Sequence, residues 1–213
     1  MPRIFVVRHG ETEGNQQKIY RGRWDLPLNE TGRIQAARTG VALKGIRFSS
    51  MYTSPLRRAT ETAAAIVAAQ AQTGVLQEPA LIDIDYGDWS RVADTDVERR
   101  FPEPYQRWKD APETVAFPNG ESLADVRSRV EPFLRRLGGG PADEQVLLVS
   151  HRVTIKVILC VVLGLGDSGF WRVAVDTTSL SVVNIDAGGM DLLSSNDTCH
   201  LKSLVEKFDA ADF

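Results

Sequence analysis

Short apolar runs alternate along the chain with segments that have the periodicity of amphipathic helices. The runs at 3–7 ("RIFVV") and 146–149 ("VLLV") are nearly uninterrupted, which is typical of strands buried on both faces of a sheet. The stretch 49–54 ("SSMYTS") is a weaker strand candidate. Residues 179–195 contain two further apolar runs separated by a Gly-Gly turn, which predicts a pair of strands.

Helices are predicted between and after these strands. The alanine-rich stretch after Ser54 has strong helix propensity, and Ser54 with Pro55 has the order expected of a capping serine and a proline in the first turn. Ser122 with Asp125 resembles a capping box at the start of an amphipathic segment. The four predicted helices span residues 33–43, 55–72, 123–137 and 154–165. This alternation predicts an α/β fold, a three-layer α/β/α sandwich with a mostly parallel central sheet.

Composition narrows the class of protein and of partner. A chain of 213 residues suits a single domain, and its apolar share of 43% and charged share of 25% are those of a soluble globular protein. The net charge of −3 argues against a general electrostatic grip on nucleic acid. No apolar run approaches the roughly 20 residues that span a bilayer, so no membrane partner is expected.

The cysteines, the histidines and the first residues favour a cytoplasmic protein without a bound metal. The first strand begins almost at residue 1, so no signal peptide is expected. Cys160 and Cys199 lie far apart, and Cys160 sits in an apolar stretch, which favours a reducing compartment. Neither the two cysteines nor the three histidines have the spacing of metal ligands, so no metal or other cofactor is expected.

Arginine and histidine side chains follow three of the predicted strands. The first strand ends at Arg8 and His9, the second runs into Ser54 to Arg58, and a third is followed by His151. In open parallel sheets ligands bind at the carboxyl ends of the strands, and Arg58 lies in a first helical turn, which favours anions. These residues therefore predict an anion site. The residues alone leave open that both histidines are hydrogen-bonded structural residues and that Arg58 is solvated.

The same residues lie in motifs that resemble those of a known family. "RHGETEGN" at 8–15 is similar to the signature of the histidine phosphatase superfamily, the phosphoglycerate-mutase-like proteins. The later blocks follow in that family's order: "RGRWDLPLNETGRIQA", "TSPLRRATETA", "DIDYGDWS", "FPNGESLADVRSRV", "LLVSHRVTIKVIL" and "NDTCHL". This ordered set spans nearly the whole chain and is far more specific than the first motif alone. The resemblance implies phosphoryl transfer without a metal.

The resemblance implies a role for each matching residue. His9 is expected to attack phosphorus and become a phosphohistidine, which water then hydrolyses. Fixed cations and hydrogen-bond donors must already be in place when the phosphoryl bond breaks. The groups expected to bind the phosphoryl oxygens are Arg8, Arg58 and His151. Asn15 is expected to add hydrogen bonds from the opening loop, and Gly10 allows a close approach of the backbone.

The general acid is where the sequence departs from the family pattern. In "LIDIDYGDW", Asp83 stands where many relatives have glutamate, which is one methylene longer. The reference pKa of aspartate, about 3.9, would have to be raised by burial or by nearby negative charge for Asp83 to protonate a leaving group. Asp83 is therefore expected to act first as acid and then as base. Asp85 and Asp88 are the nearby alternatives.

The entrance to the site suggests a substrate with a second negative charge. Arg91 and Arg152 both stand where the family often has glycine. The loop at Arg91 is therefore expected to take a different path. Arg152 directly follows His151. In the family, the stretch that matches Arg21 and Gly22 lines the substrate entrance. We therefore expect Arg21, Gly22 and Arg152 to bind a substrate that carries a carboxylate or second phosphate. The alternative is that Arg152 is a solvated first-turn residue.

The resemblance favours the phosphatase branch, a metal-independent phosphatase that hydrolyses a small phosphorylated metabolite. Phosphoglycerate mutases of the family carry a longer segment after the general-acid block, which excludes water, whereas this chain has a short stretch at 92–120. We expect that stretch to form a small helical cap within a single domain spanning 1–213. A phosphoglycerate mutase and a catalytically silent phosphate-binding protein remain the alternatives. The oligomeric state, a homodimer included, stays open.

Overall fold

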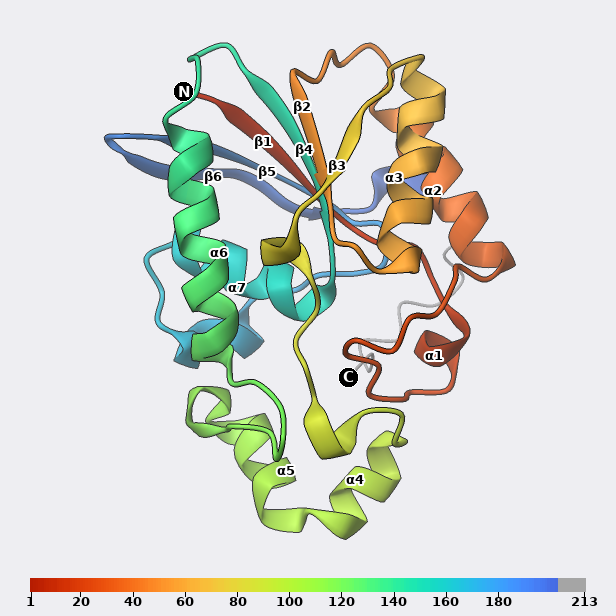
Figure 1. Cartoon of the computed structure of the whole chain (residues 1–213), viewed down its shortest axis with the longest axis vertical. Coiled ribbons are helices and arrows are strands. Elements are labelled where there is room, and N and C mark those ends of the chain that lie inside the picture. Colours follow the sequence, from red (N-terminus) through yellow and green to blue (C-terminus); the bar gives the residue numbers. More distant parts are fainter. Residues whose placement is uncertain (203–213) are drawn as a thin grey trace.

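A six-stranded sheet lies between two layers of helices in the computed structural model, which describes residues 1–202 (Figure 1). The strands are β1 (Arg3–Arg8), β2 (Ser50–Thr53), β3 (Val75–Gln77), β4 (Gln145–Ser150), β5 (Leu180–Asp186) and β6 (Gly189–Asp197). Their order is β3-β2-β4-β1-β5-β6. The first four in chain order run parallel, β5 pairs antiparallel with β1, and β6 pairs antiparallel with β5. The predicted mostly parallel sheet and the final strand pair are confirmed.

Seven α-helices occur in the described part of the chain. They are α1 (Glu13–Gln16), α2 (Glu30–Ala42), α3 (Arg57–Gln70), α4 (Asp94–Arg100), α5 (Pro102–Asp110), α6 (Leu123–Gly138) and α7 (Arg152–Val162). Short 3-10 helices are η1 (Pro79–Leu81), η2 (Gly87–Trp89), η3 (Pro112–Thr114), η4 (Asp167–Arg172) and η5 (Cys199–Leu201). Over residues 1–202, none of these helices has the length and apolar character needed to cross a membrane.

Alternation along β1 divides the core between the two faces of the sheet. Ile4 and Val6 belong to an apolar cluster with α6 and α7, whereas Phe5 and Val7 belong to a second cluster with α3 and the end of α2. Successive side chains of a strand point to opposite faces, so a strand that is apolar throughout is buried on both. The three-layer α/β/α arrangement is therefore confirmed, and it follows from the uninterrupted apolar runs of the sequence.

Helix starts show where local signals succeed and where they fail. The predicted capping box of α6 is present, with Ser122 and Asp125 each accepting from the other's backbone. In contrast, α3 begins at Arg57 rather than directly after Ser54, and Leu56 occupies the cap position. The Ser54 hydroxyl instead lies 2.7 Å from Nε2 of a histidine that follows β4. The Ser54 oxygen therefore contacts a side chain from a distant strand end and, at 3.3 Å, the Leu56 amide, and it does not cap the first turn of α3.

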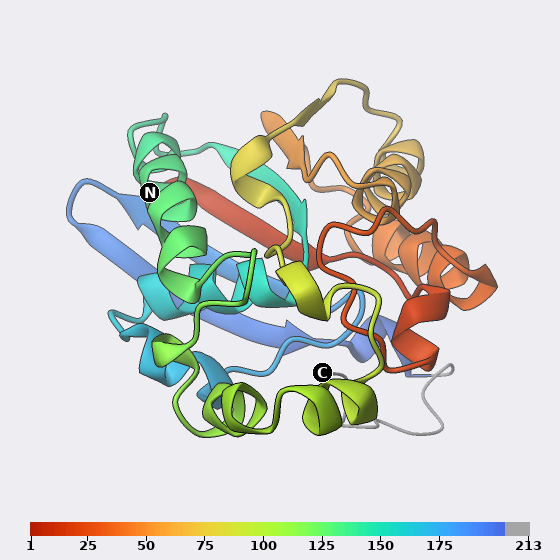
Figure 2. The ribbon, with the colours of Figure 1, turned by 60° about the horizontal axis from the view of Figure 1, so that its bottom comes forward.

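Residues 92–120, predicted to form a cap, contain α4, α5 and η3 and lie beyond the carboxyl ends of the parallel strands (Figures 1 and 2). Aromatic packing joins this segment to the rest of the molecule. Trp108 of α5 is 2% exposed and its ring centroid lies 5.1 Å from that of Phe170 in η4. Trp171 Nε1 donates a hydrogen bond of 2.7 Å to the Trp108 carbonyl. The segment is thereby fixed against η4, at the end of the sheet where ligands bind in open parallel folds.

The loop at Arg91 adopts a backbone conformation that favours glycine. Arg91 has a φ of 66°, in the left-handed region where a Cβ atom is unfavourable. Its amide donates to the Tyr20 carbonyl at 2.7 Å, and its guanidinium lies 5.4 Å from the centre of the Trp24 ring. These contacts hold an arginine in a turn for which glycine is the unstrained residue.

Candidate active site

The parallel pairing of β1, β2 and β4 brings three chain segments to one edge of the sheet. His9 follows β1 and His151 follows β4, and their ring centroids lie 5.1 Å apart. The His9 amide also donates to the Ser150 carbonyl at 2.9 Å, which continues the β1–β4 ladder into the site. Arg58 reaches the same point from the second position of α3. All three side chains are almost completely buried.

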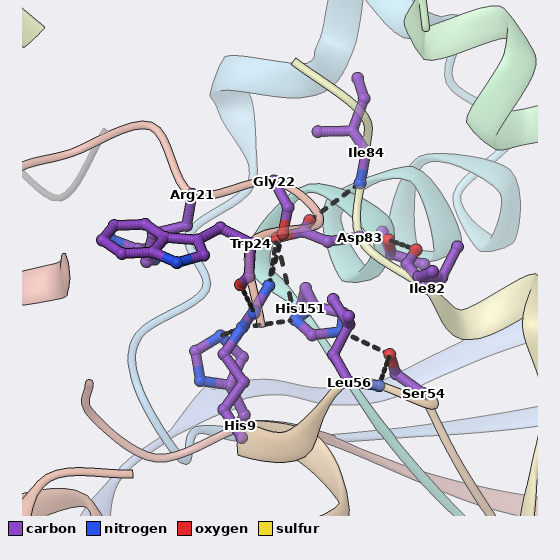
Figure 3. Close-up of polar contacts among 12 residues, drawn as sticks. His9, Arg21, Gly22, Trp24, Ser54, Leu56, Ile82, Asp83, Ile84 and His151 are labelled. Carbon is purple, nitrogen blue, oxygen red and sulfur yellow. Dashed lines mark hydrogen bonds and ion pairs between the residues drawn. The ribbon is translucent and has the colours of Figure 1, made fainter. Parts of the chain in front are cut away.

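Arg58 connects the two histidines with Asp83, and these three partners are labelled in Figure 3. Its Nε lies 3.2 Å from His9 Nε2 and 3.1 Å from His151 Nδ1, so one N–H group is shared between two imidazole acceptors. Its Nη2 donates to Asp83 Oδ2 at 3.0 Å and to the Gly22 carbonyl at 2.8 Å. Burial lowers the pKa of Arg58 to about 10, so the guanidinium is charged at neutral pH.

The hydrogen bonds of His9 define which of its ring nitrogens carries a lone pair. His9 Nδ1 lies 2.7 Å from the Gly10 carbonyl, which can only accept, so the proton of the neutral ring is assigned to Nδ1. Burial lowers the pKa of His9 well below its ordinary value, and the charges of Arg58 and Arg8 lower it further. His9 is therefore a neutral imidazole whose Nε2 lone pair faces the Arg58 N–H.

His151 has the opposite tautomer. Its Nδ1 accepts from Arg58, so Nε2 carries the proton and donates to Ser54 Oγ at 2.7 Å. Burial is the main cause that lowers the pKa of His151 well below its ordinary value, and Arg58 adds to it. Because both histidines are neutral, the positive charge of the site comes from its arginines.

Asp83 is the buried carboxyl group of the site. Its Oδ1 accepts from the Ile84 amide at 3.0 Å, and its Oδ2 lies 3.8 Å from His151 Nδ1 in addition to its ion pair with Arg58. Burial raises the pKa of Asp83, while Arg58 and then Arg21 oppose that rise. Burial is the largest cause, so Asp83 holds a proton more readily than an ordinary aspartate. This is the direction that the expected acid role requires.

The two alternative carboxyl groups have other partners. Asp85 Oδ1 accepts from the Gly87 amide at 2.9 Å, and its Oδ2 lies 3.8 Å from Arg23 Nη1. Asp88 Oδ1 accepts from Asn119 Nδ2 at 3.1 Å on the surface. Neither residue lines the cavity described next, so the geometry favours Asp83 among the three carboxyl groups.

A cavity that is partly open to solvent lies over His9 and Asp83. Its lining residues are His9, Arg21, Gly22, Asp83, Tyr86, Trp108, Arg152, Val153, Phe170 and Trp171. The aromatic members come from α5, η2's preceding loop and η4, so the residues around 92–120 and 167–172 form one wall. Sequence reasoning missed Tyr86, Phe170 and Trp171. The adjacent aromatic pair shortly after the predicted helix at 154–165 was the one available signal, and core packing explains such a pair equally well.

The residues expected to bind substrate differ in their placement. Arg21 lines the cavity, and its Nη1 donates to the Gly14 carbonyl at 2.8 Å. Gly22 has a φ of 50°, and a Cβ there would lie 2.9 Å from the Ile84 carbonyl oxygen, so the close approach requires glycine. Arg152 is the first residue of α7, and its guanidinium lies 5.8 Å from the centre of the Trp171 ring, at the cavity.

Three other predicted residues are not among those that line the cavity. Arg8 is buried, and its Nη1 donates to the Val175 carbonyl at 2.9 Å. Asn15 is not among the lining residues, and its Oδ1 accepts from the Thr12 amide at 3.0 Å to form the cap of α1. At Gly10 the close approach is to another backbone, because a Cβ there would lie 2.5 Å from the Gly32 carbonyl oxygen.

The arrangement is suited to transfer of an anionic group to a histidine. A neutral imidazole with its lone pair on Nε2 can act as a nucleophile once Arg58 releases it, fixed guanidinium groups can stabilise a developing negative charge, and a carboxyl with a raised pKa can supply a proton. Within residues 1–202, no group of three or more histidine, cysteine, aspartate or glutamate residues is placed to hold a metal ion.

Comparisons with known proteins agree on one family. Residues 4–198 match the sequence profile of the "Histidine phosphatase superfamily (branch 1)". Phosphoserine phosphatase 1 of Hydrogenobacter thermophilus is 36% identical over 201 residues, which is 94% of this chain and 95% of that protein. The adenosylcobalamin/alpha-ribazole phosphatase of Escherichia coli is 29% identical over 86% of this chain and 90% of its own. The structure of Bacillus stearothermophilus YhfR superposes with a TM-score of 0.88 at 26% identity, covering 94% of this chain and 100% of that one.

Proposed function

The chain belongs to branch 1 of the histidine phosphatase superfamily, and from this premise we propose that it is a metal-independent phosphatase. It hydrolyses a small phosphomonoester through a phosphohistidine formed at His9 Nε2. The observation that carries the proposal is the buried hydrogen-bond network in which Arg58 joins His9, His151 and Asp83. The neutral His9 has its proton on Nδ1 and its lone pair on Nε2, and the buried Asp83 with a raised pKa lies across Arg58 from it.

The first step transfers the phosphoryl group to the enzyme. The His9 Nε2 lone pair attacks phosphorus, the phosphorus–oxygen bond to the leaving group breaks, and the leaving oxygen takes the proton of the Asp83 carboxyl. Arg58 and Arg8 are buried beside His9 and balance the charge that spreads over the phosphoryl oxygens. Without substrate, Arg58 Nε binds the lone pairs of both histidines. Before the attack, it must release them and bind oxygens of the phosphoryl group instead.

The second step releases inorganic phosphate. Asp83, now a carboxylate, takes a proton from water as the water oxygen attacks phosphorus. The bond between phosphorus and His9 Nε2 breaks, which restores the neutral imidazole and the protonated carboxyl. His151 donates to Ser54 from Nε2 and accepts from Arg58 at Nδ1, so its place in the mechanism is to hold Arg58 in position; binding a phosphoryl oxygen would require a proton on its Nδ1.

The substrate is proposed to carry a second anionic group, bound by Arg152. The cavity is lined by two guanidinium groups, those of Arg21 and Arg152, and by the single carboxyl of Asp83. Arg21 donates to the backbone carbonyls of Gly14 and Ile19, and the Arg152 guanidinium lies 5.8 Å from the centre of the Trp171 ring. Replacing Arg152 with alanine should lower kcat/KM for phosphate esters that also bear a carboxylate, relative to neutral sugar phosphates. Unchanged relative rates would refute the second-anion assignment.

The phosphatase proposal is tested by trapping the intermediate and by following both products. The purified protein, with chelator present, is incubated with a panel of labelled phosphomonoesters and quenched. We expect phosphate release together with an acid-labile, alkali-stable phosphoprotein that is absent from the His9→Ala variant. Loss of activity in chelator, or label retained in the variant, would overturn the mechanism. Interconversion of 2- and 3-phosphoglycerate without phosphate release would instead show a mutase, and neither activity would show a silent phosphate-binding protein.

A further inference from the structure

The segment that carries Asp83 has no regular secondary structure of its own. Residues 83–86 lie in no helix or strand, and the segment links η1 to η2. Irregular segments are usually held loosely, because no ladder of backbone hydrogen bonds restrains them. Asp83 is nevertheless buried, and its side chain is shorter by one methylene than the glutamate of many relatives. A short acid must be held accurately to reach a leaving group.

Side chains from three other elements take the place of a backbone ladder along residues 80–85, which we call the acid segment. Four consecutive carbonyls, those of residues 80–83, each accept a hydrogen bond from a side chain. Arg129 of α6 donates from Nη1 to the Ala80 carbonyl at 2.6 Å and from Nη2 to the Asp83 carbonyl at 3.3 Å. Between them, the Leu81 carbonyl accepts from Ser150 Oγ at 2.7 Å, and the Ile82 carbonyl accepts from Thr154 Oγ1 at 2.8 Å.

Two of the three donor residues flank His151. Ser150 is the last residue of β4, and Thr154 is the third residue of α7, so both belong to the strand–helix junction that presents His151. Ser150 and Thr154 are completely buried. The spacing between His151 and the acid segment is therefore held by hydrogen bonds on either side of the histidine. Figure 3 shows Ile82, Asp83 and Ile84 on an extended segment that passes His151.

The third donor is itself restrained. Arg129 Nη2 lies 3.6 Å from Glu121 Oε2, and the same carboxylate oxygen accepts from the Asp85 amide at 2.9 Å. Glu121 Oε1 accepts from Arg23 Nη2 at 2.7 Å. Arg129 and Glu121 thus hold the acid segment together, Arg129 at the carbonyls of residues 80 and 83 and Glu121 at the amide of residue 85.

We propose that Arg129, Ser150 and Thr154 form a carbonyl clamp that positions Asp83 for proton transfer to the leaving group. The inference rests on the proposed function, since it assigns these residues to the acid step of that reaction. They are positioning residues, because they contact the backbone of the acid segment and do not line the cavity. Loosening the clamp should impair the reaction only where the leaving group needs a proton.

The test compares substrates with different leaving groups. Phosphoserine serves as an alkyl ester, whose alkoxide needs a proton, and p-nitrophenyl phosphate as an ester whose phenolate leaves without one. The readout is kcat/KM, which reports the steps up to loss of the leaving group. The test variants are Thr154→Val and Arg129→Met, with Thr154→Ser and Arg129→Lys as conservative counterparts. Thr39→Val is the matched control, because the Thr39 hydroxyl donates to a helix carbonyl on α2.

We expect Thr154→Val and Arg129→Met to lower kcat/KM for the alkyl ester at least about tenfold while changing that for p-nitrophenyl phosphate less than about threefold. Thr154→Ser and Arg129→Lys should recover part of the loss, and Thr39→Val should show none. An equal loss on both substrates, or no loss on either, overturns the clamp. Asp83→Asn separates the two hypotheses. If it lacks the same leaving-group dependence, the acid role of Asp83 fails, whatever the clamp variants do.

Discussion

A buried lysine beside the cavity makes a quantitative prediction about stability. Lys156 of α7 is 2% exposed, and its Nζ lies 4.7 Å from the centre of the Phe170 ring and 4.5 Å from that of Trp171. Its one hydrogen bond among residues 1–202 goes to the Phe170 carbonyl at 3.4 Å, and no carboxylate there forms an ion pair with it. Burial, and then the charge of Arg152, lowers the pKa of Lys156 to about 7.

The direction of the effect follows from proton counting. In the unfolded chain Lys156 has an ordinary pKa of about 10.4, so between the two pKa values the unfolded state binds more protons than the native state. Stability should therefore rise with pH through this window, and the full cost of burying the charge is present below about pH 7. The slope approaches about 1.4 kcal/mol per pH unit, which gives a gain of about 2 kcal/mol between pH 7 and pH 9.

The assay is denaturant unfolding of the wild type and of Lys156→Met at pH 7 and pH 9. The methionine keeps the length and apolar stem without the titrating group, so we expect the variant to lack the 2 kcal/mol gain, about 4–8 °C in Tm for a protein of this size. Subtracting the unfolding free energy of the variant from that of the wild type at each pH cancels the contributions of all other titrating groups. Lys44→Met, at an exposed lysine, should follow the wild type. If Lys156→Met follows the wild type to within about 0.5 kcal/mol, Lys156 is not a desolvated cation.

Three further substitutions test other features. Arg91→Gly should raise the unfolding free energy by about 0.5–1 kcal/mol, because the relief of left-handed strain exceeds the added chain entropy, and Arg91→Ala in denaturant unfolding should show no such gain. Trp171→Phe removes the N–H donor to the Trp108 carbonyl, worth about 1 kcal/mol, so hydrogen exchange over 94–117 should accelerate; unchanged protection would contradict this. Gly10→Ala would set a Cβ 2.5 Å from the Gly32 carbonyl oxygen, so kcat should fall at least about tenfold, and wild-type activity would show that the loop adapts without cost.

The elements that follow from local patterns were predictable. The strands β1 and β4 were recognisable because each contains four consecutive apolar residues, and burial on both faces leaves no polar position within such a run. The start of α6 was recognisable because its capping box involves residues three apart. The start of α3 was predicted wrongly, since Ser54 has a partner from another part of the chain. A local sequence pattern predicts the start of a helix correctly only when its polar groups hydrogen-bond to each other and not to distant parts of the chain.

The site was predictable as a set of residues but not as a network. His9, Arg58 and His151 could be named from strand ends and motifs, because parallel strands must bring their carboxyl ends together. The sharing of one Arg58 N–H between two histidines could not be foreseen, nor could the opposite tautomers that follow from it. The aromatic wall was not predicted at Phe170 and Trp171, because an adjacent aromatic pair in a sequence is equally typical of ordinary core packing.

The sequence by itself determined five of the six described strands, all but β3, together with the helical layers, the family motifs and the identity of the candidate nucleophile. These depend on periodicity and on residue types within a few positions, which the chain specifies before it folds. Only the tertiary structure decided which histidine nitrogen carries a lone pair, that burial raises the pKa of Asp83, and that the backbone carbonyls of residues 80–83 accept hydrogen bonds from side chains. Those properties depend on contacts such as that between Thr154 and residue 82, 72 positions apart, and on desolvation, which exists only when the chain has closed around the site.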